Sequence, residues 1–147
     1  MTNRFFVFYL PVFVLGTLVV AIMLAIVITR FRRRSNLDLF GMSREDVRER
    51  WTQIEKTSRD GVMGAKLAVM EADSLLDSVF KSMAMPGNTL GERLKVASAR
   101  YPEIRSVWWA HKLRNQIAHD SSFRLGNRQA KNALDEFHRA LKKLGAL

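Results

Sequence analysis

Three side chains that could bind and cleave a phosphate ester lie close together near the C-terminal end of the chain: Arg114, Asn115 and His119. They fall within Pro102–Asp120, where apolar residues recur at helical spacing, so we expect one amphipathic helix there. Asn115 and His119 are four residues apart and would share a face, and the long Arg114 side chain could reach the same place. An arginine fork suits phosphate oxygens, a histidine carries protons near neutral pH, and an amide can orient either group.

The run that holds these residues resembles the Arg-polar-spacer-His signature of HEPN domains, and it reads Arg114-Asn115-Gln116-Ile117-Ala118-His119. The resemblance covers roughly Met42 to Leu147, in motif and helical pattern. It implies a helical bundle in which Arg114 holds the phosphate, His119 acts as acid or base, and Asn115 orients them. It also implies a homodimer whose two motifs form one composite, metal-independent ribonuclease site. Many HEPN-like domains only bind nucleic acid or proteins, so RNA cleavage and RNA binding both stay open.

The same three residues also have a structural interpretation. Arg114 would pair with an acid of the central helix, His119 would interact with the negative end of the helix dipole, and Asn115 would complete a turn. The corresponding alternative function is a non-catalytic, membrane-tethered helical interaction or scaffold protein.

Other sites have weaker support in the sequence. The chain has no Cys, which excludes disulfides and thiolate metal sites. His111 and His119 are two helical turns apart and not naturally bidentate, so we predict no metal; we expect His111 between helices and His138 on the solvent side. No glycine-rich phosphate loop is present, and we predict no cofactor. An exposed Trp109 would mark a partner or dimer surface.

The composition is strongly basic, with a formal net charge of +10 from 24 Lys and Arg against 14 Asp and Glu in 147 residues. Such a charge attracts nucleic acid or anionic lipid headgroups, although solubility or membrane topology would also account for it.

The N-terminal part suggests a membrane anchor. Phe5–Thr29 holds 25 residues without a charge, enough to span a bilayer as one helix. Four arginines follow it and only Arg4 precedes it, so we predict a single-pass membrane protein with a cytoplasmic C-terminal domain. The same arginines could contact anionic lipid headgroups: Arg30, Arg32, Arg33 and Arg34.

The remaining chain reads as helices throughout. Ser43 is expected to cap a helix that runs to about Arg59, and Thr89 to cap a short helix. Between them a very apolar helix from Val62 to Met83 would be central, with its acids on the outer surface: Glu71, Asp73 and Asp77. The predicted fold is therefore all-α: a transmembrane anchor over residues 1–34, a linker over 35–42, and a four- to five-helix HEPN-like bundle over 43–147.

Overall fold

The computed structural model of the protein describes residues 16–25 and 41–147. The chain divides into two units, Met1–Leu37 and Asp38–Leu147, and each is treated by itself. Within residues 41–147 of the second unit every regular element is a helix: α2 (Arg44–Thr57), α3 (Gly61–Ser82), α4 (Leu90–Arg100), the 3₁₀ turn η1 (Pro102–Ile104), α5 (Val107–His119) and α6 (Asn127–Lys143). The predicted helical bundle is confirmed for this part of the chain.

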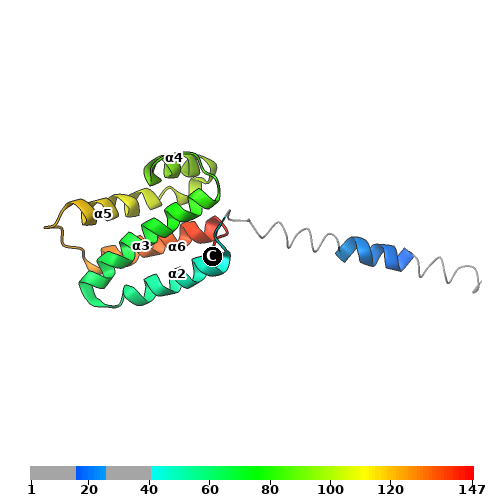
Figure 1. The fold of residues 1–147 in the computed structure, drawn as a ribbon, viewed down its shortest axis with the longest axis horizontal. Coiled ribbons are helices and arrows are strands. Elements are labelled where there is room, and N and C mark those ends of the chain that lie inside the picture. The colour runs from blue at the N-terminus through cyan, green and yellow to red at the C-terminus, as the bar shows by residue number, and fades with distance from the viewer. Residues whose placement is uncertain (1–15, 26–40) are drawn as a thin grey trace, which may run out of the picture. The chain divides into compact units, whose positions relative to one another are not determined.

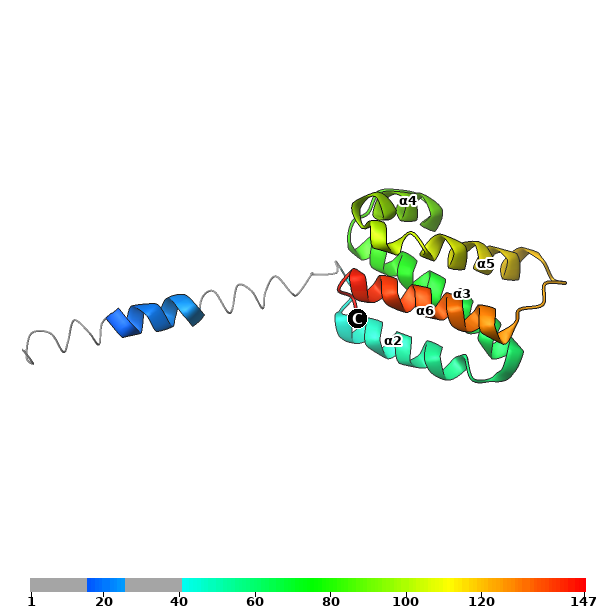
Figure 2. The same ribbon diagram turned by 180° about the vertical axis from the view of Figure 1, so that it is seen from behind.

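Helix α3 is the centre of the bundle, as its apolar sequence predicts. It contacts α2, α4, α5 and α6. Figures 1 and 2 show α3 and α6 between α2 on one side and α5 on the other, with α4 beyond α5. A helix covered on several sides must be apolar on several sides. Its buried apolar residues are Ala65, Ala68, Val69, Ala72, Leu75, Leu76, Val79 and Phe80.

The helix starts follow from short-range hydrogen bonds. The Ser43 hydroxyl accepts from the Asp46 N–H at 3.0 Å, and the Asp46 carboxylate accepts from the Ser43 N–H at 2.8 Å, which makes a capping box for α2. The Thr89 hydroxyl likewise accepts from the Glu92 N–H, as expected. Where the sequence predicted one helix over Pro102–Asp120, the chain forms η1 first, and α5 begins only at Val107.

The predicted transmembrane helix, and with it the single-pass localisation and cytoplasmic placement, is wrong. No helix within residues 16–25 and 41–147 is long and apolar enough to cross a membrane. The described helix of the apolar segment covers residues 16–25. The lipid contacts predicted for Arg30, Arg32, Arg33 and Arg34 lie outside the described residues.

Candidate functional site

The site is built on the flank of α5 that faces α3. Helix α5 buries Val107, Ala110 and Leu113 and contacts both α3 and α6. With these residues turned inward, His111, Arg114 and Asn115 come to the edge of α5, where all three are half-buried.

Across from them, α3 presents Asp73, which is only 3% exposed. The sequence placed this acid on an outer surface, and the structure buries it. A buried carboxylate requires charged or hydrogen-bonding partners, and the residues at the edge of α5 supply them.

Four side chains close into one network, which we call the α3–α5 ring: Asp73, His111, Arg114 and Asn115. His111 Nδ1 lies 2.8 Å from Asp73 Oδ1, and Asn115 Nδ2 lies 3.3 Å from His111 Nε2. Arg114 Nη1 donates to Asn115 Oδ1 at 3.1 Å. Arg114 Nε lies 3.2 Å from Asp73 Oδ2; its N–H is not aligned for a hydrogen bond, so this contact is an ion pair. One hydrogen bond and one ion pair of the ring link α3 to α5, and two further hydrogen bonds join its three side chains on α5.

The donors and acceptors of the α3–α5 ring are mutually consistent for one protonation state. Arg114 only donates, so the Asn115 oxygen faces it and the Asn115 nitrogen faces His111. His111 Nε2 must then accept, and the proton of a neutral imidazole sits on Nδ1, where Asp73 accepts it. In this arrangement Nδ1 faces the carboxylate and Nε2 faces the amide, so Asp73 and Asn115 together fix the orientation of the imidazole ring.

The ring forms one wall of an open pocket of about 410 Å³ between α3, α5 and the first turn of α4. Glycine at position 91 leaves space beside the imidazole, since an added Cβ there would lie 3.8 Å from His111 Nε2. The lining residues are Asp73, Ser74, Asp77, Thr89, Leu90, Gly91, His111, Arg114 and Asn115.

Both carboxylates that line this pocket, Asp73 and Asp77, have cationic partners. Asp77 pairs with Arg93 at 2.9 Å and with Lys81 at 2.7 Å. Burial raises the pKa of Asp77, but the hydrogen bonds and charges of Arg93 and Lys81 outweigh it and hold that pKa below its usual value. Arg114 pairs with Asp73 in the same way, so neither carboxylate of the pocket lining is without a cationic partner.

His119, the third residue of the predicted motif, does not join the ring. It is exposed at the last position of α5, and it does not line the pocket. Within residues 41–147, no hydrogen bond or ion pair to its side chain is found. Asn115 has a histidine one turn away in each direction, and it bonds to His111 rather than to His119.

Sequence reasoning therefore identified Arg114 and Asn115 as neighbours in a site but missed His111 and Asp73. One signal was present: the His111–Asn115 spacing of four equals that of Asn115 and His119. The structural interpretation of Arg114, pairing with an acid of the central helix, is confirmed by its contact with Asp73. The catalytic roles assigned to Arg114, Asn115 and His119 stay predictions.

Comparison with known proteins adds no relatives. No protein-family model, curated protein or solved structure matches this chain. The HEPN resemblance therefore depends on the motif and the helical pattern alone.

A second pocket, of about 310 Å³, lies at the other side of the bundle and contains the remaining histidine. His138 stacks on Trp51 with ring centroids 5.1 Å apart and planes at 11°, and the Trp51 ring N–H donates to Glu55. His138 was expected on the solvent side, but it covers a tryptophan of the core. Within residues 16–25 and 41–147, no group of three or more His, Asp or Glu side chains could hold a metal ion.

Proposed function

We propose that the helical unit of residues 41–147 binds RNA and that Arg114 contacts a phosphate of the strand at the α3–α5 ring. The observation that carries the proposal is the way the ring holds Arg114. Its Nε faces Asp73 and one Nη1 proton goes to Asn115, while its side chain stays 31% exposed at the pocket rim. The outer N–H groups of a guanidinium fixed in this way suit two oxygens of one phosphate.

Charge and resemblance support the same ligand. The chain carries a net charge of +10, and contacts with phosphates are the main source of affinity for nucleic acid. The motif around Arg114 resembles that of HEPN domains, which points to RNA among the polyanions. DNA of the same sequence is the control ligand.

Binding is tested with a short, fluorescently labelled single-stranded RNA and the full chain, by anisotropy over a range of salt concentrations. Arg114→Gln is expected to raise Kd roughly 10-fold or more, since hydrogen bonds to charged groups contribute about 1.5–3 kcal/mol. Arg105→Gln is the matched control, because Arg105 is exposed at the turn before α5 and lies outside the pocket. Arg105→Gln should raise Kd only by the small amount expected from the loss of one surface charge. Equal losses in the two variants, or no salt-dependent binding by the wild type, would rule the proposal out.

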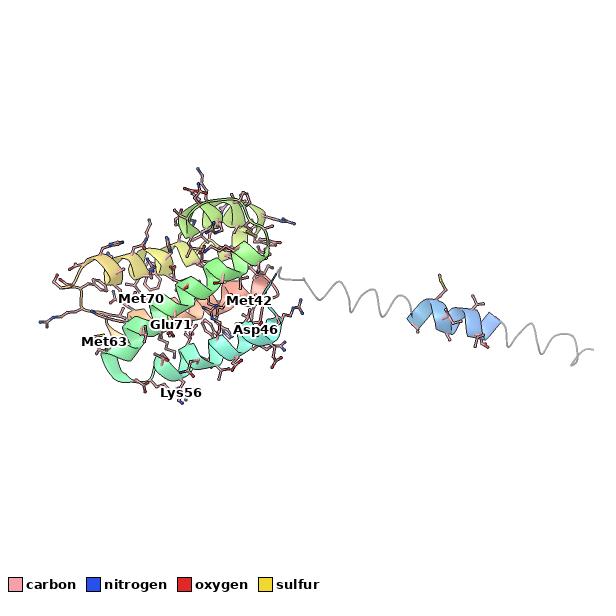
Figure 3. The ribbon with its side chains drawn as sticks, in the orientation of Figure 1. Met42, Asp46, Lys56, Met63, Met70 and Glu71 are labelled. Atoms are coloured by element: carbon pink, nitrogen blue, oxygen red, sulfur yellow. The ribbon has the colours of Figure 1, made fainter. Side chains whose placement is uncertain are left out.

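The HEPN resemblance also leads us to propose a homodimer. An apolar stripe at the start of α3 supports it, because three large side chains there are exposed: Val62 at 55%, Met63 at 76% and Leu67 at 48%. Figure 3 shows Met63 near the start of α3 and Met70 two turns further along the same helix. Apolar surface of this kind is typical of protein interfaces. Sedimentation velocity should show a dimer that the Met63→Ser, Leu67→Ser double variant converts to monomer; a wild-type monomer at all concentrations contradicts it.

The alternative function, a helical interaction protein without RNA binding, has the same exposed stripe in its favour. Trp109 on α5 gives further support for an interaction surface, because 44% of its surface is exposed. The RNA-binding and sedimentation assays described above distinguish the two functions. An interaction protein would lose self-association in the Met63→Ser, Leu67→Ser variant, while its affinity for RNA would not depend on Arg114.

A further inference from the structure

We propose that Trp109 is the stacking platform for one base of the bound RNA, so that an unpaired strand crosses the exposed face of α5 between Arg114 and Trp109. This inference rests on the RNA binding proposed above, and it adds a second contact and the class of RNA that is bound. It assigns to the RNA a tryptophan that the alternative function would give to a protein partner.

Trp109 is the tryptophan whose ring is accessible. Trp51 is 6% exposed and stacks on His138, and Trp108 is half-buried and meets the His111 ring edge-on. Trp109 is 44% exposed, and within residues 16–25 and 41–147 no ring contact or hydrogen bond of its side chain is found. Its indole can therefore receive a flat ligand without displacing another side chain.

The surroundings of Trp109 favour an anionic partner. Its exposed neighbours on the helix surface, three or four positions away, are polar or basic: Arg105, Ser106 and Lys112. Helix α5 contains no Asp or Glu, and none of its other large apolar side chains is exposed. The centre of a protein interface is apolar over a wider area. A single aromatic ring beside cations is typical of proteins that bind single-stranded nucleic acid.

A row of side chains connects Trp109 to the α3–α5 ring. Trp109, Lys112 and Asn115 are spaced by three, so they form one ridge on the surface of α5, with neighbouring Cβ atoms about 5–6 Å apart. Asn115 is the member of the ring to which Arg114 Nη1 donates at 3.1 Å. Trp109 is therefore two steps of the ridge, roughly 11 Å, from the residue that holds Arg114. A strand with a phosphate on Arg114 can cover that distance in a few nucleotides and passes Lys112 on the way.

Stacking on Trp109 requires an unpaired base. In a duplex the neighbouring pairs cover both faces of each base, and aromatic side chains accordingly stack on the bases of single strands. Every base offers a flat face, so the contact tolerates any sequence. We therefore expect Trp109 to contribute to the binding of single-stranded RNA, with little preference among the bases, and not to the binding of duplex RNA.

Anisotropy with the full chain and a short, labelled single-stranded RNA measures this contribution. Trp109→Leu keeps an apolar side chain but removes the aromatic face, and it should raise Kd roughly 5- to 150-fold. Trp109→Phe keeps a smaller aromatic face and should lose less affinity. Val96→Ala is the control, because it truncates an exposed apolar side chain on α4, and it should bind as wild type does.

Strands that each lack one base assign the loss to stacking. At one position the missing base should weaken binding to wild type but not to Trp109→Leu, because the variant has already lost the same contact. For a fully paired duplex of the same sequence, wild type and Trp109→Leu should have equal affinity.

Equal affinity of wild type and folded Trp109→Leu for the single strand overturns the inference, and so does a base-removal profile that is the same in both proteins. If binding then still depends on Arg114, the proposed RNA binding stands, whereas a wild type that binds no RNA overturns both. Loss of self-association in Trp109→Leu at unchanged RNA affinity assigns Trp109 to a protein interface and also overturns the inference. If circular dichroism shows that Trp109→Leu does not fold, tryptophan fluorescence decides. RNA should then quench wild-type emission more than that of Trp109→Phe, and equal quenching overturns the inference.

Discussion

The α3–α5 ring predicts a specific loss of stability in Asp73→Asn. The substitution keeps the shape of the side chain, and its oxygen can still accept the Nδ1 proton of His111, which is now 2.8 Å from Asp73. Its nitrogen, however, takes the place of the oxygen that lies 3.2 Å from Arg114 Nε. One of the four links of the ring is thus replaced by two donors facing each other.

The size of the loss follows from burial. Contacts to charged groups contribute about 1.5–3 kcal/mol, and an unpartnered buried donor adds a penalty of similar size. Asp73 is buried, but the Arg114 side chain is 31% exposed, so water can solvate the guanidinium once the pair is lost. We therefore expect a loss of about 1–2 kcal/mol, which corresponds to a fall in Tm of roughly 5–10 °C for a domain of this size.

Thermal unfolding followed by circular dichroism measures this loss, and a double-mutant cycle with Arg114→Met assigns it to the pair. The two substitutions should be non-additive by about 1 kcal/mol, because each removes the same ion pair. Asp135→Asn is the charge-matched control, since Asp135 is exposed on α6 and away from the ring, and it should change stability by less than about 0.5 kcal/mol. Wild-type stability in Asp73→Asn, or strict additivity with Arg114→Met, would refute the ring as a stabilising element.

Two glycines should respond to alanine with opposite signs. At Gly64 an added Cβ would lie 2.3 Å from the Thr57 carbonyl oxygen, so Gly64→Ala is expected to destabilise the bundle by about 1–3 kcal/mol in the same unfolding assay. At Gly91 the nearest atom would be 3.8 Å away, so Gly91→Ala should gain up to about 1 kcal/mol from helix propensity; equal effects in the two variants would contradict this packing. Acid should also destabilise the bundle through Asp77, whose pKa lies below its usual value when folded. Its contribution is complete above the unfolded pKa of about 3.9 and is lost as the pH falls through the lower folded value, so Tm measured between roughly pH 5 and 2.5 should fall less steeply in Asp77→Asn.

Part of this protein follows from its sequence alone. The starts of α2 and α4 were predictable, because Ser43 and Thr89 bond to N–H groups only three residues away. The apolar periodicity from Val62 onward identified α3 and its central place, because burial on several sides requires it. Arg114 and Asn115 were identified as neighbours of a site because their chemistry and spacing are visible in one short run.

The composition of the site was decided by the tertiary structure. Asn115 has a histidine four residues before it and another four after it, and helical geometry treats the two alike. Asn115 bonds to His111 rather than to His119, because Asp73, 38 residues away in the chain, is buried against His111 and holds its ring in place. Which acid of α3 is buried depends on how α5 lies across that helix, and no local pattern specifies a contact between helices.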